Sequence, residues 1–243
     1  MQTELNAKEA AHAKAVREMF AGIARRYDLL NHVLSLNIDR RWRRLVSREL
    51  QDILAQPGAN ILDVACGTGD LTLELAEKSC GQLKLIGTDF CRPMLTIADD
   101  KEAIYGWGIS FVESDALALP FDDDQFDALT IAFGLRNLAN FADGLAELHR
   151  VLKPNGKIAI LEFSSPIIPG FRQLFNFYFA NILPRIGGAV SGSRGAYEYL
   201  PDSVRKFPDQ KNLTLLMERT GFTQVKYQNL TGGIAALHSG TKT

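Results

Sequence analysis

Residues 60–70 read Asn-Ile-Leu-Asp-Val-Ala-Cys-Gly-Thr-Gly-Asp, and leucines follow them at helical spacing. This pattern predicts a strand, a tight loop and a helix. The apolar run that ends in an acid is the strand, the turn with two glycines is the loop, and the apolar residues at helical spacing form the helix. Gly67 and Gly69 let the backbone approach a ligand and adopt φ values that other residues avoid. The N–H groups of the first helical turn then need acceptors, which Thr68, Asp70 or a nucleotide-like ligand can supply.

The acids around this loop indicate the kind of ligand. Asp63 and Asp70 would repel a pyrophosphate at the helix N-terminus, so the ligand should carry an amino group or a positive charge. A second apolar run ends at Asp89, where an acid can chelate ribose hydroxyls. After a third run, Asp115 and Ala116 can meet an adenine edge through a carboxylate oxygen and a backbone N–H. This spacing resembles the S-adenosylmethionine site of class I methyltransferases.

Composition narrows the class of protein further. The 243 residues are 46% hydrophobic, enough for one α/β domain and short for two. The net charge of -1 provides no field to gather nucleic acid, which disfavours RNA methylation. The three cysteines have no CxxC spacing and suit a reducing, cytoplasmic compartment. The acidic run 122–124 is expected in a solvated turn, and we predict no metal site.

Strand and helix patterns alternate from residue 60 onward. This alternation predicts a Rossmann-like, doubly wound α/β sheet with right-handed crossovers. The expected strands cover 60–65, 83–89, 109–113, 126–132 and 157–163, and the expected helices cover 70–79, 93–103, 141–152 and 209–220. Two further β-rich runs, Phe222–Leu230 and Ile234–Ser239, predict a hairpin that completes the mostly parallel sheet with an antiparallel edge strand.

We expect a single domain over 1–243, with a helical cap over 1–55, a cofactor-binding core over 56–165, and a lid helix with the C-terminal strands over 166–243. The cap begins with an amphipathic helix over 9–23. Its arginines around Trp42 are either a basic patch for an anionic substrate or a solvated helix face. We favour the solvated face, with the apolar side turned to the core: Trp42, Leu45, Val46 and Leu50.

The segment Phe171–Val190 is rich in aromatic residues but is too interrupted to span a bilayer. It either packs on the core as a lid helix or lines an apolar pocket and touches a membrane surface.

Motifs from Met19 to Lys242 together resemble the UbiE-type C-methyltransferases of quinone biosynthesis. The glycine loop and its neighbours are shared by many methyltransferases, whereas the pieces near the two ends are more specific. The family usually has glycine where Asn37 and Asn155 stand, and asparagine also tolerates a left-handed backbone. The pieces that carry the resemblance are 27–31, 35–42, 67–70, 133–137, 161–164, 197–203 with 207–208, and 230–237.

The resemblance implies S-adenosylmethionine as cofactor and a polyprenylated quinol as substrate, from either the menaquinone or the ubiquinone pathway. A polyprenyl tail is apolar, so we also expect transient contact with a membrane surface. The near-zero net charge predicts no nucleic acid partner, and the sequence leaves a homodimer open. Relatives often have serine where Ala132 stands, so a hydroxyl contact there is lost. The residues expected to bind the cofactor are Asp63, Gly67, Thr68, Gly69, Asp89, Phe90, Asp115, Ala116 and Ala132.

The catalytic candidates follow the strand over 126–132, at the sheet edge where ligands bind in such folds. Arg136 would stabilise an ionised ring oxygen because its guanidinium stays charged, and Asn137 would orient that oxygen. Their structural alternatives are a surface arginine and a helix cap. Tyr27 and Asp28 are expected to position the ring or to relay its proton.

Three other functions are consistent with parts of this pattern. The first is a class I methyltransferase that acts on another small aromatic or lipid acceptor, against which the terminal motifs argue. The second is a nicotinamide-dependent oxidoreductase, disfavoured by the absent third glycine and by the acids around the loop. The third is a non-catalytic, cofactor-binding scaffold of a quinone-pathway complex.

Overall fold

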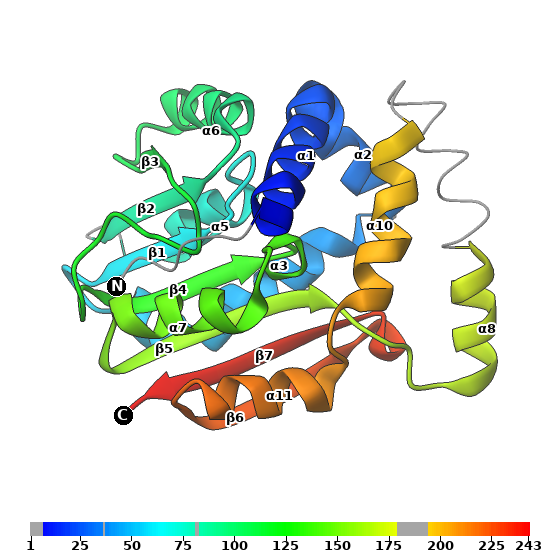
Figure 1. The fold of residues 1–243 in the computed structure, drawn as a ribbon. Coiled ribbons are helices and arrows are strands. Elements are labelled where there is room, and N and C mark those ends of the chain that lie inside the picture. The colour runs from blue at the N-terminus through cyan, green and yellow to red at the C-terminus, as the bar shows by residue number, and fades with distance from the viewer. Residues whose placement is uncertain (1–6, 36, 81–82, 179–193) are drawn as a thin grey trace.

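The computed structural model describes residues 7–35, 37–80, 83–178 and 194–243. Within them a seven-stranded sheet has the strand order β3-β2-β1-β4-β5-β7-β6 (Figure 1). Strands β1 to β5 are parallel, and β7 runs antiparallel to both β5 and β6, which confirms the predicted fold class. The strands are β1 Asn60–Val64, β2 Lys84–Asp89, β3 Ser110–Glu113, β4 Phe126–Ala132, β5 Leu152–Phe163, β6 Phe222–Leu230 and β7 Ala235–Lys242.

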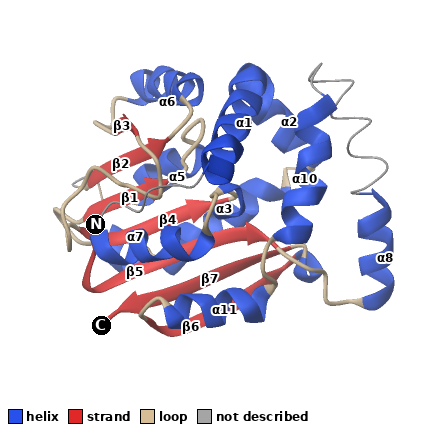
Figure 2. Cartoon of the chain, in the orientation of Figure 1, coloured by secondary structure: helices blue, strands red, loops and turns tan. Residues whose placement is uncertain are grey.

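Helices cover both faces of the sheet, and α1 and α10 stand side by side beyond its carboxyl edge (Figures 1 and 2). Short 3-10 turns lie between several elements: η1 Ala24–Arg26 between α1 and α2, η2 Leu135–Asn137 between β4 and α7, and η4 Thr231–Gly233 between β6 and β7. The α-helices are α1 Ala7–Ile23, α2 Tyr27–Leu34, α3 Ile38–Glu49, α4 Gln51–Leu54, α5 Asp70–Lys78, α6 Arg92–Tyr105, α7 Phe141–Val151, α8 Pro169–Phe177, α10 Arg194–Lys206 and α11 Gln210–Arg219.

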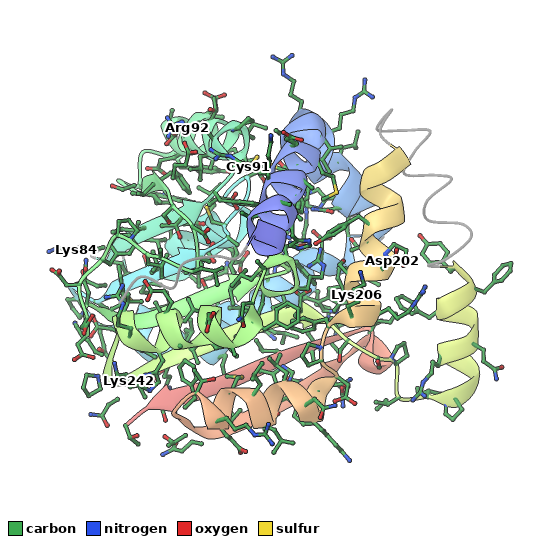
Figure 3. All side chains as sticks on the ribbon, in the orientation of Figure 1. Lys84, Cys91, Arg92, Asp202, Lys206 and Lys242 are labelled. Carbon is green, nitrogen blue, oxygen red and sulfur yellow. The ribbon has the colours of Figure 1, made fainter. Side chains whose placement is uncertain are left out.

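Two apolar cores form, one on each face, because the strands alternate their side chains between the faces. On one face, α3, α4 and α5 pack against residues such as Ile61 and Leu161. On the other, α7 and α11 pack against Leu62 and Ile160. Side chains fill the space between the sheet and its helices (Figure 3). Trp42, Leu45, Val46 and Leu50 pack in the first core, which confirms the prediction for the cap.

Two local predictions are wrong. The N-cap of α5 is Gly69, with φ of 80°, and neither Thr68 nor Asp70 caps the helix. Both side chains instead form hydrogen bonds to other residues, Thr68 to Asp28 and Asp70 to Lys101. The strand expected from 157 begins at Leu152, directly after α7. It pairs at Leu152, is interrupted, and resumes pairing at Lys157, so the Pro-Asn-Gly turn lies inside the strand.

The C-terminal hairpin has the predicted form, with η4 joining β6 to β7. The segment expected to form a lid helix, Phe171–Val190, can be compared with the structure only in part. Helix α8 ends at Phe177, and residues 179–193 lie outside the described residues. Helix α10 was not expected. It contains Gly195 and Pro201, which ordinarily disfavour a helix interior. Its position against α1 and η2 brings it to the carboxyl edge of the sheet, where the functional candidates gather.

Candidate active site

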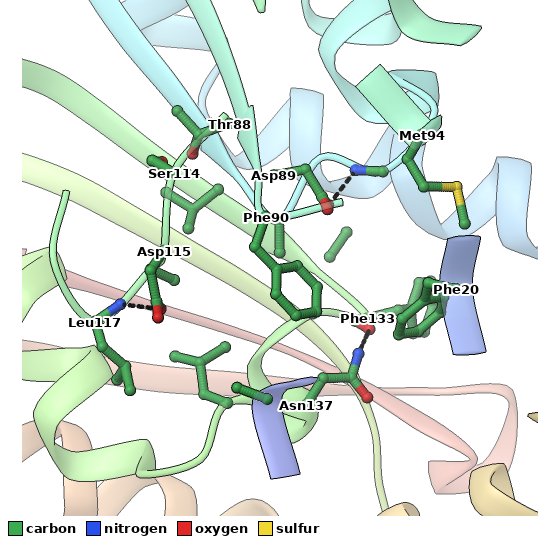
Figure 4. Close-up of a pocket in the computed structure, with 18 of the residues that line it drawn as sticks. Phe20, Thr88, Asp89, Phe90, Met94, Ser114, Asp115, Leu117, Phe133 and Asn137 are labelled. Atoms are coloured by element: carbon green, nitrogen blue, oxygen red, sulfur yellow. Dashed lines mark hydrogen bonds between the residues drawn. The ribbon is translucent and has the colours of Figure 1, made fainter. Parts of the chain in front are cut away.

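A cavity of about 750 Å³, open mouth included, lies at the carboxyl ends of β1, β2 and β4. The strand order reverses there, between β1 and β4, and such a switch point is where open α/β sheets bind ligands. Figure 4 shows the lining side chains, which come from these strand ends, from α1 and from the turn after β4.

Asp89 ends β2 at the cavity wall, and its carboxylate is held by backbone groups. The Gly67 N–H donates to Oδ2 at 2.9 Å, and the Cys91 N–H donates to Oδ1 at 2.8 Å. Gly67 itself has a φ of 57°, in the left-handed region that favours glycine. Burial raises the pKa of Asp89 to about 6 against these hydrogen bonds. The carboxylate is therefore fixed in orientation, with lone pairs left for a ligand.

The predicted adenine contacts also reach the cavity. Phe90, Asp115, Ala116 and Ala132 line it together with Gly67 and Asp89. The Leu117 N–H donates to Asp115 Oδ1 at 2.9 Å, which fixes that carboxylate (Figure 4).

Three predicted cofactor residues, Asp63, Thr68 and Gly69, do not line the cavity. Asp63 is buried and accepts hydrogen bonds from Thr72 at 2.6 Å and Thr130 at 2.7 Å. Burial raises the pKa of Asp63 to about 6. Asp63 therefore ties β1 to α5 and β4 beneath the loop. Its contact with a cofactor stays a prediction.

The catalytic candidates Arg136 and Asn137 meet at one carbonyl group. The Phe133 backbone oxygen accepts a hydrogen bond from Arg136 Nη1 and another from Asn137 Nδ2, the latter at 3.3 Å. Phe133 has a φ of 57°, an uncommon conformation for a bulky residue, which turns its carbonyl toward η2. Asn137 lines the cavity, whereas Arg136 is buried behind it.

Arg136 is held by a buried ion pair with Glu162 of β5, with Nη1 2.8 Å from Oε1. The guanidinium also stacks on the ring of Phe163, 5.2 Å from its centroid. Burial raises the pKa of Glu162, and the charge of Arg136 opposes that rise. Arg136 Nε has no hydrogen-bond partner within the described part of the chain. The surface position considered for Arg136 is wrong, because its side chain is almost fully enclosed.

Tyr27 and Asp28 begin α2 but face different surroundings. Tyr27 lines the cavity beside Gly67, and burial raises its pKa while the charge of Arg136 opposes the rise. Asp28 accepts a hydrogen bond from Thr68 and pairs with Lys101 at 2.7 Å. Asp28 therefore supports the glycine loop from behind, and this geometry gives no support to a proton relay through it.

Several residues in or beside the cavity were not singled out from the sequence. Phe20 of α1 and Met94 of α6 line it, and Tyr199 of α10 donates to Asn137. The helical spacing of apolar residues around Phe20 predicts an amphipathic helix. It does not indicate which residues of that helix contact a ligand. Tyr199 lies in a family-specific stretch, and that was its only signal.

Two unpartnered hydroxyl groups test whether a nucleoside cofactor fits. Thr88 Oγ1 and Ser114 Oγ are buried without hydrogen-bond partners among the described residues, and both residues line the cavity. Buried hydroxyls ordinarily have partners, so a polar ligand is expected at both positions. The cavity thus combines carboxylates for ribose and an amino group, apolar walls for a ring, and free hydroxyls. These residues fit S-adenosylmethionine.

A second polar cluster, behind the glycine loop, has ligand atoms at metal-binding spacing: His32, Asp39 and Asp70. Arg43 already pairs with Asp39 at 2.8 Å and with Asp70 at 3.1 Å. These contacts and Lys101 neutralise the carboxylates, so the cluster is a salt-bridge network that fixes α2, α3 and α5. No helix in the described part of the chain has the length and apolar character that a membrane crossing needs.

The fold and the cavity define a class I S-adenosylmethionine-dependent methyltransferase. The crystal structure of a SAM-dependent methyltransferase from Aquifex aeolicus has the same fold, with a TM-score of 0.59 and 18% sequence identity over 81% of this chain and 89% of that one. The sequence model of the ubiE/COQ5 methyltransferase family matches residues 6–242. The chain belongs to this family, which confirms the resemblance and makes it a C-methyltransferase of quinone biosynthesis.

Two curated relatives cover nearly the whole chain. The demethylmenaquinone methyltransferase of Deinococcus radiodurans is 49% identical over 94% of this chain and 93% of its own length. The ubiquinone/menaquinone biosynthesis C-methyltransferase UbiE of Citrifermentans bemidjiense is 46% identical over 93% of this chain and 96% of its own length. The family membership implies S-adenosylmethionine as methyl donor.

Proposed function

We propose that the chain methylates a ring carbon of a polyprenylated quinol at the cavity between β1 and β4, with Arg136 and Asn137 acting on the ring oxygen. The observation that carries this proposal is the convergence of both side chains on the Phe133 carbonyl, at the wall of the cofactor-type cavity. The family match over 6–242 supports the reaction.

The cofactor would be held by Asp89 at the ribose, by Asp115 and Ala116 at the adenine edge, and by Thr88 and Ser114 at the remaining polar atoms. Bound S-adenosylmethionine supplies an activated sulfonium methyl group. The protein has to supply orientation and a nucleophilic ring carbon, since proximity is the larger part of such a transfer. Phe20 and Tyr27 enclose the cavity from the helical cap.

The ring carbon becomes nucleophilic when the neighbouring quinol hydroxyl loses its proton. Arg136 stabilises the resulting negative charge from behind the cavity wall, because its guanidinium lies in a buried, low-dielectric position. Asn137 donates an N–H to the same oxygen. Bound S-adenosylmethionine would supply the methyl group and leave as the neutral thioether, and the ring carbon would then release its proton to water, which restores the aromatic ring. The oxidised quinone lacks this nucleophile and should not react.

We further propose reversible contact with a membrane surface through α8 and the residues before it. Ile167, Ile168 and Phe177 are all more than half exposed there, and α8 lies at the edge of the molecule (Figure 1). A polyprenyl tail is apolar, and an exposed apolar edge allows it to pass from the bilayer to the cavity. Phe175, on the same helix, packs against Ile23 and so joins this edge to the cap.

The test is a single-turnover assay with methyl-labelled S-adenosylmethionine and two short-tailed acceptors, a demethylmenaquinol and the ubiquinol-pathway quinol. We expect label on a ring carbon of at least one quinol and none on the oxidised quinones. Cofactor binding without transfer to either quinol would contradict the proposal and favour a scaffold.

The variant that probes Arg136 is the double substitution Arg136→Met with Glu162→Gln. It removes the buried ion pair as a unit, and such replacements are ordinarily tolerated by the fold, whereas the single substitution leaves an unpaired buried charge. Label transfer should fall about 100-fold or more, the cost of losing a transition-state charge partner. Transfer at the wild-type rate by the folded double variant would contradict the role given to Arg136.

A further inference from the structure

The side-chain amide of Asn137 has only one orientation that satisfies its neighbours. The Phe133 carbonyl oxygen can only accept a hydrogen bond, so the Asn137 atom 3.3 Å from it must be the nitrogen, Nδ2. The amide oxygen, Oδ1, then lies 3.2 Å from the Tyr199 hydroxyl. Because Oδ1 can only accept, the Tyr199 hydroxyl must donate. One proton of Tyr199 and one of Nδ2 thus fix the amide from both ends.

This arrangement leaves one donor free at the cavity. Nδ2 carries two hydrogens, and only the one toward Phe133 has a partner among the described residues. Asn137 lines the cavity, so the second N–H is available to an oxygen of a bound ring. If the amide rotated by 180°, its oxygen would face the Phe133 carbonyl and the cavity would receive an acceptor instead. An acceptor would repel an ionised ring oxygen.

Tyr199 is itself held in place from several directions. It lies in α10, which packs against α1 and η2, and its ring lies 6.3 Å from that of His12 of α1, between centroids. Burial raises its pKa, with Arg136 opposing the rise and Glu162 adding to it. The phenol therefore keeps the proton that it donates.

We propose that Tyr199 is a positioning residue for methyl transfer, which acts by holding the Asn137 amide so that its free N–H meets the reacting ring's oxygen. This inference rests on the proposed function, since it presumes an acceptor ring with an ionisable oxygen. It gives α10 a role in the reaction that the sequence did not indicate. It also predicts the class of acceptor, which must present a hydrogen-bond-accepting oxygen beside the carbon that is methylated.

The test is a double-mutant cycle with Tyr199→Phe and Asn137→Ala, measured as kcat/KM for the reduced acceptor together with the dissociation constant for S-adenosylhomocysteine. Tyr199→Phe should lower kcat/KM about 10-fold in the wild-type background and less than about two-fold in the Asn137→Ala background, because the hydroxyl acts through the amide. Cofactor affinity should stay within about two-fold. The matched control is Tyr105→Phe, at an exposed tyrosine of α6, which should leave kcat/KM unchanged.

Equal losses in both backgrounds, or no loss in the first, would overturn the inference while the wild-type enzyme still transfers label. Failure of the wild-type enzyme to label either quinol would instead contradict the proposed function, and the inference with it. If methyl transfer by Asn137→Ala is too slow to measure, the same double-mutant cycle uses a dissociation constant instead. That constant is measured for a short-tailed naphthalenediol and the S-adenosylhomocysteine-loaded proteins. Circular dichroism confirms that each variant is folded.

Discussion

Asp63 is an almost fully buried carboxyl group near the end of β1, beneath the glycine loop. Burial raises the pKa of Asp63 from 3.8 to about 6, and the hydrogen bonds from two threonine hydroxyls oppose that rise. An acid with a raised pKa adds stability that is complete below its ordinary pKa and is lost as the pH rises through the raised value. The relevant window is therefore about pH 4 to 6.

We predict that Asp63→Asn gains stability relative to the wild-type protein by about 2 kcal/mol as the pH rises from 4 to 7. Asparagine keeps the shape and cannot ionise, so only the wild-type protein carries a buried charge at neutral pH. Urea unfolding of both proteins at several pH values measures the difference. A difference that does not change with pH would show that Asp63 titrates normally. Affinity for S-adenosylhomocysteine should change less than about three-fold, since Asp63 does not line the cavity.

Single residues also show which local features the sequence could reveal. Asn37 and Asn155 have φ values of 60° and 63°, the left-handed conformations expected where relatives carry glycine. Ala65 and Phe133 adopt similar conformations at the ends of β1 and β4, and nothing in their residue types indicates it. Their backbones are held by the contact between the two loops, where a Cβ on Gly134 would lie 2.5 Å from that of Ala65. Such strain depends on tertiary packing and was not predictable.

At the scale of elements, the predictable parts are those with a strong local period. The strands β1, β2 and β4 and the helices α5, α7 and α11 lie close to their expected ranges, because burial imposes alternating or helical apolar patterns on them. Helix α10 was missed because Gly195 and Pro201 mask its pattern, and it forms where α1 and η2 provide packing. The same packing places Tyr199 beside Asn137, so the missed helix explains the missed residue.

The apolar edge at α8 leads to a prediction about membrane contact. Ile168→Glu or Phe177→Glu should weaken partitioning to anionic liposomes about 10-fold, since each removes an exposed apolar side chain whose burial contributes about 1.5–3 kcal/mol. The matched control is Ile104→Glu at the end of α6, which is exposed to a similar or greater degree at the opposite end of the molecule (Figure 1). Liposome sedimentation measures the partitioning. Equal losses in the control would indicate a general effect of charge, and unchanged sedimentation would contradict contact through α8.

At the scale of the whole molecule, the cavity is built from segments far apart in the sequence. The strand ends supply Asp89 and Ala132, α1 supplies Ala13 and Phe20, and α10 contacts both α1 and η2. The glycine loop and the acids at the strand ends could be recognised from sequence because their spacing is local. The cap could not be placed, since its position depends on contacts between the two ends of the chain. A bound cofactor should therefore stabilise α1 directly, although α1 precedes the whole sheet in sequence.

Hydrogen exchange tests this coupling between the cap and the sheet. With S-adenosylhomocysteine at 100 times its dissociation constant, the folded state gains about 2.7 kcal/mol, and amides of α1 that open locally should be protected by up to this amount. Local openings of α11, which packs on β6 and β7 at the end of the sheet away from the cavity, should not change, and this helix is the internal control. NADH at the same concentration should protect neither helix, since the acids around the glycine loop repel its pyrophosphate. Protection of α1 by NADH would favour an oxidoreductase, whereas an α1 that exchanges equally with and without S-adenosylhomocysteine would show that the cap does not enclose the cofactor.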